Sequence, residues 1–114
     1  MHGIKTIIYP VDDLEGAKRR FSALLGTAPT VDAPYYVGWN VDGQDIGLDP
    51  HGHAQGMTGP IAYLHVDDIH ARLQGLVDDG AEVVRDVQDV GGGRLIATAA
   101  DPDGNVIGLL QDPT

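Results

Sequence analysis

The chain has 114 residues, and its 17 acidic and 7 basic residues give it a formal net charge of −10. This length suits one small domain, and the negative charge disfavours nucleic acids and anionic membranes as partners, whereas it suits a neutral or cationic ligand. The absence of cysteine excludes disulfides, thiolate nucleophiles and cysteine-bound zinc. No apolar run approaches the ~18 residues of a spanning helix, and the N-terminus does not resemble a signal peptide, so we expect a cytoplasmic protein.

The first half of the chain reads as a strand, a helix and further short strands. Residues 5–11 (KTIIYPV) are rich in β-branched and aromatic side chains, which indicates a strand. Asp12 and Asp13 offer N-cap oxygens for a helix that Gly26 should end. Residues 35–41 and 44–48 read as a hairpin around Asp42-Gly43. The predicted apolar face of the helix consists of Leu14, Ala17, Phe21, Leu24 and Leu25.

The second half repeats this order after a segment rich in glycine and proline. We interpret residues 50–60 as the linker between a first module at about 1–49 and a second at about 61–114. Residues 61–66 predict a strand, Asp67 and Asp68 begin a helix, and Gly80 ends it. Three further strands are expected at 81–84, 94–100 and 105–110. The fold class is therefore predicted as α+β, with two tandem βαβββ modules inside one domain.

Two echoes support a duplication of this unit. VDDL at 11–14 returns as VDDI at 66–69, and VDGQDIGL at 41–48 returns as PDGNVIGL at 102–109. The echoes are 55 and 61 positions apart, so the second module carries about six extra residues between its helix and its last hairpin. Each copy places a glycine, Gly47 or Gly108, inside a predicted strand. A glycine there can mark a bulge or the wall of a cavity.

The paired modules, the VDD helix starts and the closing DPDGNVIGLLQ resemble the vicinal oxygen chelate superfamily, which includes glyoxalases, bleomycin-resistance proteins and extradiol dioxygenases. The resemblance covers essentially the whole chain and implies curled mixed sheets around a cup-shaped cavity. In metalloenzymes of this superfamily, the metal ligands lie on the first and last strand of each module. The corresponding residues are Thr6, Gly47, Ile61 and Gly108, none of which is a good metal ligand. We therefore expect no bound metal and no cofactor.

Strand alternation indicates which other side chains face the predicted cup. Ile61, Tyr63 and His65 should share that face of one strand. His65 is interpreted as a hydrogen-bonding group, although Asp45 is a remote partner for a metal site. Trp39 is either a stacking surface for a planar ligand or part of the core. Arg94 is either an anchor for an anionic group or solvated. The candidate ligand-binding residues are Thr6, Ile8, Trp39, Asp45, Gly47, Ile61, Tyr63, His65 and Gly108.

These residues predict a metal-independent binding protein for a small, partly planar, neutral or cationic molecule, of the kind that sequesters an antibiotic. The alternatives are a glyoxalase-like metal-dependent lyase, isomerase or dioxygenase with a non-standard site, and a structural domain. We expect a homodimer, because the buried fraction of so short a chain is modest. Neither nucleic acid nor a membrane is an expected partner.

Overall fold

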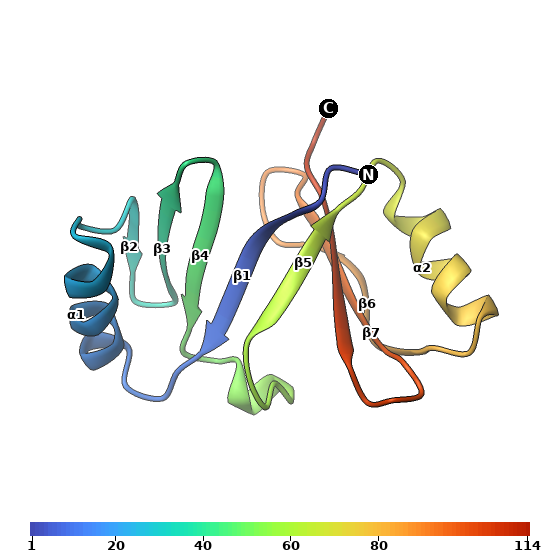
Figure 1. The fold of residues 1–114 in the computed structure, drawn as a ribbon, viewed down its shortest axis with the longest axis horizontal. Helices are drawn as coiled ribbons and strands as arrows, with labels where there is room; N and C mark the ends of the chain where they lie inside the picture. The colour runs from blue at the N-terminus through green and yellow to red at the C-terminus, as the bar shows by residue number, and fades with distance from the viewer. The chain divides into compact units, whose positions relative to one another are not determined.

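The computed structural model describes all 114 residues, which form two α-helices, eight β-strands and one short 3₁₀ helix. The chain divides into two compact units (Figure 1). The N-terminal unit comprises Thr6–Ile61, and the C-terminal unit comprises Ala62–Thr114 together with Met1–Lys5. The first residues accompany the C-terminal unit because the backbone of His2 and Gly3 hydrogen-bonds to the backbone of His65, at 2.8 and 2.9 Å.

The N-terminal unit has the predicted βαβββ order. Its elements are β1 (Ile4–Pro10), α1 (Leu14–Leu25), β2 (Val31–Ala33), β3 (Tyr36–Val41) and β4 (Gln44–Asp49). The strand order is β2-β3-β4-β1, antiparallel except for the parallel pair of β1 and β4. The 3₁₀ helix His53–Gln55 lies in the predicted linker.

The C-terminal unit repeats this arrangement. Its elements are β5 (Ile61–His65), α2 (Ile69–Asp78), β6 (Glu82–Asp89), β7 (Leu95–Ala100) and β8 (Val106–Gln111). The order is β6-β7-β8-β5, with β5 and β8 parallel. The extra residues of the second module lie largely in β6, which has eight residues where β2 has three. The α+β class and the two βαβββ modules are thus confirmed.

The local signals act as the sequence predicts. Asp13 and Asp68 are the N-caps of α1 and α2, accepting from the backbone N–H of Gly16 and Ala71 at 3.0 and 3.1 Å. Asp42 and Gly43 both have positive φ, 51° and 83°, as the tight turn of the β3–β4 hairpin requires.

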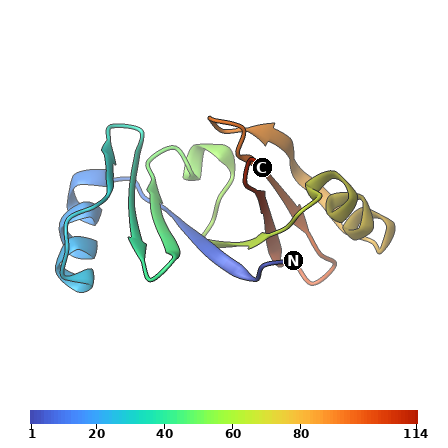
Figure 2. The same cartoon turned by 90° about the horizontal axis from the view of Figure 1, so that it is seen from above.

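Each unit packs its helix on one face of its own strands (Figure 2). In the N-terminal unit, Ala17 of α1 packs with Val37, Trp39 and Leu48. In the C-terminal unit, Ile69 and Leu73 of α2 pack with Ala97, Ala99 and Leu109. Strand side chains alternate, so every second residue points to the opposite face, which we call the helix-free face of the unit.

Leu24, a predicted member of the apolar face of the first helix, and Val77 of α2 are largely outside these cores. Leu24 is 77% exposed and Val77 is 38% exposed. Their neighbours Leu25 and Leu76 do pack against the cores, so Leu24 and Val77 lie outside the buried side of their helices. Neither helix is long and apolar enough to cross a membrane.

Candidate functional site

The helix-free face of the N-terminal unit is organised around a pair of glycines. Gly38 of β3 lies opposite Gly47 of β4, and Gly47 lies opposite Ile8 of β1. The ring of Tyr36, two residues before Gly38 on the same face, lies over both glycines. A Cβ atom on Gly38 would come within 2.9 Å of Tyr36 Cε2, and one on Gly47 within 2.8 Å of Tyr36 Cε1. The glycines are therefore required by the close approach of a phenol ring.

The next row of this face is polar. Thr6 of β1 lies opposite Asp45 of β4, which in turn lies opposite Asn40 of β3. Asn40 Nδ2 donates to Asp45 Oδ1 at 2.9 Å, and Thr6 is only 2% exposed. The Asp45 carboxylate is thus held by a neutral amide within its own unit.

On the helix-free face of the C-terminal unit, a tyrosine ring again lies beside a glycine. Gly108 of β8 lies between Tyr63 of β5 and Thr98 of β7. A Cβ atom on Gly108 would come within 2.6 Å of Tyr63 Cδ1 and 2.8 Å of the Ala62 carbonyl oxygen. Tyr63 is 4% exposed, so its ring is fixed in the space that a side chain on Gly108 would need.

Thr98 is the unusual polar residue of this face. It is 2% exposed, and its Oγ1 is buried with no hydrogen-bond partner. An unsatisfied buried hydroxyl costs free energy. Its position in the same row as Tyr63 and Gly108 makes it a candidate to bind a polar group of a ligand.

The third polar feature is a cluster of His65, Asp112 and Arg94. The His65 ring is 7% exposed, and its Nδ1 lies 3.5 Å from Asp112 Oδ2. Arg94 Nε donates to Asp112 Oδ1 at 2.8 Å. The hydrogen bond from Arg94 lowers the pKa of Asp112, partial burial opposes this effect, and the positive charge of Arg94 and the nearby His65 ring lower the pKa further. Asp112, between a guanidinium and an imidazole, therefore stays ionised to lower pH than an isolated aspartate would.

The structure groups the sequence-predicted site residues by unit. Thr6, Ile8, Asp45 and Gly47 share the helix-free face of the N-terminal unit, by the register of β1 and β4. Tyr63, His65 and Gly108 share that of the C-terminal unit, by the register of β5 and β8. Ile61, 6% exposed, lies on the same side of β5 as Tyr63 by strand alternation.

Trp39 is the exception and corrects one sequence-based assignment. It packs on the opposite face of β3, where it is 2% exposed and lies 6.0 Å from the Phe21 ring. Its Nε1 donates to the carbonyl oxygen of Thr27 at 3.1 Å. The core alternative is therefore the correct one, and Trp39 is no longer among the candidate ligand contacts.

Sequence reasoning missed Tyr36, Thr98 and Asp112. Tyr36 shares a strand face with Gly38 by alternation, but the pattern of residues 35–41 does not indicate which face is buried. Thr98 gave no signal, since a threonine in a strand is ordinary. Asp112 follows β8, and only the fold brings it to His65 and Arg94. Arg94 pairs with Asp112, so it is not simply solvated.

The residues present do not fit the metal site that the resemblance implies. Thr6 and Ile61 stand at the positions expected on the first strands, and Gly47 and Gly108 at those on the last strands. The tyrosine rings over the two glycines occupy the room that a ligating carboxylate or imidazole would take. No group of three or more His, Asp or Glu side chains is arranged to hold a metal ion. The chemistry that remains on these faces is aromatic, hydroxyl, imidazole and carboxylate.

Comparison with known proteins places this fold in a family. A family model described as the glyoxalase/bleomycin resistance protein/dioxygenase superfamily matches residues 3–109. A superfamily member from Vibrio splendidus is 19% identical with a TM-score of 0.70, over 94% of this chain and 97% of that one. Methylmalonyl-CoA epimerase from Streptomyces coelicolor is 16% identical with a TM-score of 0.71, over 100% and 96% of the two chains.

A Mn(II)-bound glyoxalase from Novosphingobium aromaticivorans is also similar. It is 16% identical with a TM-score of 0.70, over 96% of this chain and 38% of its own. No curated protein sequence gives a significant match. At these identities the structural likenesses show a shared fold.

Proposed function

Because this chain belongs to the glyoxalase/bleomycin resistance protein/dioxygenase superfamily, we propose that it is a metal-independent binding protein for a small molecule. The ligand would contact a helix-free face, where the candidate residues of that unit lie. Sequestration of an antibiotic or another natural product is the specific role that we propose. The ligand would be neutral or cationic, since the chain carries a net charge of −10.

One observation carries this proposal: tyrosine rings stand where the resemblance expects metal-binding side chains. Tyr36 lies over Gly47, and Tyr63 lies over Gly108. The half-buried Tyr36 ring, next to a backbone without side chains, offers a flat apolar surface. Such a surface can stack on a planar ligand and contributes about 0.5–1.5 kcal/mol per aromatic pair beyond area burial.

Polar groups beside the rings would set the orientation of the ligand. The Thr98 hydroxyl is buried without a partner in the row of Tyr63 and Gly108. A ligand that supplies a hydrogen bond to this oxygen would remove a desolvation cost that the free protein bears. Binding pockets commonly combine a mostly apolar lining with a few such polar groups.

The test joins metal analysis with ligand titration. Protein purified without chelator should carry far less than one divalent ion per chain by elemental analysis. Calorimetry with a panel of planar neutral and cationic compounds should find a ligand whose affinity does not change on addition of chelator. Near-stoichiometric metal, together with loss of binding or of glyoxalase-like turnover in chelator, would instead favour the metal-dependent enzyme.

A pair of tyrosine variants supplies the matched control. Tyr63→Leu should weaken the ligand about tenfold, which corresponds to about 1.4 kcal/mol. Tyr35→Leu should leave the affinity unchanged, because Tyr35 is 68% exposed and lies just before β3. Equal effects of the two substitutions would contradict a site at the Tyr63 ring.

A further inference from the structure

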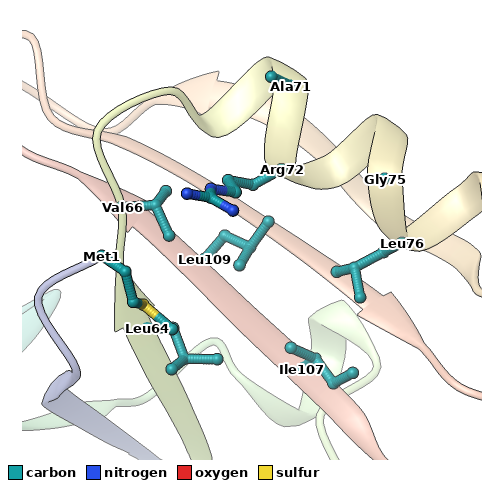
Figure 3. Close-up of a pocket in the computed structure, with 9 residues that line it drawn as sticks. All are labelled: Met1, Leu64, Val66, Ala71, Arg72, Gly75, Leu76, Ile107 and Leu109. Atoms are coloured by element: carbon teal, nitrogen blue, oxygen red, sulfur yellow. The ribbon is translucent and has the colours of Figure 1, made fainter.

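The C-terminal unit contains a pocket on its helix side, away from the residues discussed above. It has a volume of about 330 Å³ and lies between α2 and the strands β5 and β8 (Figure 3). Leu64, Val66 and Leu109 line it and belong to the side of the strands that faces α2. Tyr63, His65 and Gly108 alternate with these residues and point to the other side. The pocket is therefore separate from the proposed ligand-binding face.

The duplication shows why the C-terminal unit has room for a pocket at this position. With the 55-residue offset of the VDD echoes, Leu64 corresponds to Tyr9 and Leu76 to Phe21. In the N-terminal unit the rings of Tyr9 and Phe21 lie 5.1 Å apart and fill the space between helix and strands. Two leucines replace these two rings in the C-terminal unit, so the corresponding volume is only partly filled.

β7 and α2 also carry smaller side chains than the corresponding positions of the N-terminal unit. Ala99 pairs with Ile107 in the register in which Trp39 pairs with Ile46. An alanine thus stands where the N-terminal unit has its largest core side chain. On α2, Gly75 corresponds to Arg20 of α1, and apart from its chain neighbours and the backbone of the helix itself nothing lies within 4 Å of the place where its Cβ would be. The helix therefore leaves the pocket open at this point.

One charged side chain lines this apolar pocket. Arg72 of α2 extends toward the end of the pocket at Val66, whereas Leu76 and Ile107 line the other end (Figure 3). The Arg72 guanidinium has no hydrogen bond or ion pair within the protein, although the chain has 17 carboxylates.

The two carboxylates at the start of α2 have other partners. Asp68 caps the helix, and Asp67 accepts from His2 Nε2 at 2.6 Å. Arg72 is thus a cation without an internal partner beside an apolar wall. A guanidinium prefers a carboxylate, to which it can donate two parallel hydrogen bonds.

We propose that this pocket binds a compact amphipathic carboxylate. Its apolar body would lie among Leu64, Leu76, Ile107 and Leu109, and its carboxylate would pair with Arg72. The volume is at the small end of the roughly 300–1,000 Å³ of ligand pockets, which limits the apolar body to a short chain or one ring. This ligand is an anion, whereas the ligand proposed for the helix-free faces is neutral or cationic.

The experiment compares three probes that share one chain: hexanoate, hexanol and hexylammonium. Binding is followed by NMR on the intact protein, through the methyl groups of Leu64 and Leu76 and the amides of Tyr63 and Gly108. Hexanoate should bind about tenfold more tightly than hexanol, and hexylammonium should bind most weakly. The shifts should concentrate on the two leucines. Equal affinities of hexanoate and hexanol, shifts centred on Tyr63 and Gly108, or no saturable shift would each overturn the proposal.

Matched variants test the charge of Arg72 and the space in the pocket separately. Arg72→Gln should make hexanoate bind no more tightly than hexanol, while Arg20→Gln on α1 changes the net charge equally and should have no effect. Leu76→Phe, which copies Phe21 of the other module, should weaken both probes about tenfold or more. Leu24→Phe, at a 77% exposed position, should weaken neither. Unchanged hexanoate binding in Arg72→Gln and Leu76→Phe, with wild-type thermal unfolding, would also overturn the proposal.

Failure here is distinguishable from failure of the proposed function. The planar ligand is followed at Tyr63 and the hexanoate at Leu64 and Leu76, so each can be lost while the other remains. Tyr63→Leu should leave hexanoate binding unchanged. Loss of hexanoate binding in that variant, with the fold intact, would contradict two separate sites.

Discussion

Tyr63 and Gly108 lie opposite each other on the parallel strands β5 and β8, and the Tyr63 ring fills the space beside the glycine. Tyr36 and Gly47 repeat this relationship in the N-terminal unit. In each module the residue at the expected metal-ligand position of the last strand is a glycine. An aromatic ring occupies the space that a side chain at this position would need. At these positions the chain therefore offers an aromatic surface where the resemblance implies a ligating side chain.

The first prediction concerns the cost of a methyl group at Gly108. Gly108→Ala should lower the free energy of unfolding by about 1–3 kcal/mol, because the new Cβ would overlap the Tyr63 ring and the Ala62 carbonyl oxygen. Urea unfolding at neutral pH measures this. The control is Gly59→Ala, because apart from the chain neighbours nothing lies within 4 Å of the place where its Cβ would be. This substitution should change the free energy of unfolding by no more than about 0.5 kcal/mol. A stabilising Gly108→Ala would show that the ring is not fixed there.

The second prediction concerns the buried hydroxyl of Thr98. Thr98→Val keeps the shape of the side chain and removes an oxygen that has no partner, so the variant should be more stable than the wild type by about 1 kcal/mol. The same variant should bind the proposed planar ligand more weakly. Thermal unfolding and calorimetry check the two effects.

Thr30→Val serves as the comparison for that variant. The Thr30 hydroxyl donates to the Gly38 carbonyl oxygen at 3.2 Å, so this substitution should destabilise the protein. A loss of stability in Thr98→Val would indicate that its hydroxyl has a bonding partner in solution.

The third prediction concerns acid stability through Asp112. The pKa of Asp112 is lower in the folded protein than its ordinary value, chiefly because of the hydrogen bond from Arg94. The stabilisation is therefore complete above the unfolded pKa of about 4 and is lost as the pH falls through the folded pKa. Since the Asp112 side chain is 50% exposed, we expect less than about 1 kcal/mol.

The measurement is the unfolding free energy of wild type and Asp112→Asn between neutral pH and about pH 2. The difference between the two proteins should shrink as the pH falls. Arg94→Gln should flatten the profile in the same way, whereas Glu82→Gln, an exposed carboxylate in β6, should not. A difference that grows toward acid pH would have the wrong sign for this ion pair.

The fourth prediction concerns Trp39, the only tryptophan. Because it is 2% exposed beneath α1, acrylamide should quench its fluorescence poorly, and a ligand on the helix-free faces should leave its emission unchanged. Trp39→Ala should cost about 3–5 kcal/mol. Tyr35→Ala, at a 68% exposed position, should cost at most about 0.5 kcal/mol. Efficient quenching would contradict the core position.

The order of elements could be predicted from the sequence because its signals are local. Asp13 and Asp68 cap the helices where the VDD echoes predict, and the Asp42-Gly43 turn forms the expected hairpin. Helix capping, turn geometry and the alternation of strand side chains act over a few residues, so each can be recognised in the sequence without knowledge of the fold. The duplication also shows which residues of the two modules correspond to each other. This correspondence explains the pocket beneath α2.

Only the tertiary structure decided which side chains meet across strands. A shift of one residue in register exchanges the two faces of a strand, and for residues 35–41 the pattern did not distinguish the faces. Trp39 consequently belongs to the core, and Tyr36 takes its place beside Gly47. The approach of Asp112 to His65, 47 positions earlier, likewise depends on the pairing of β5 with β8. Contacts between distant segments follow from register and packing, which a single sequence specifies only through the complete fold.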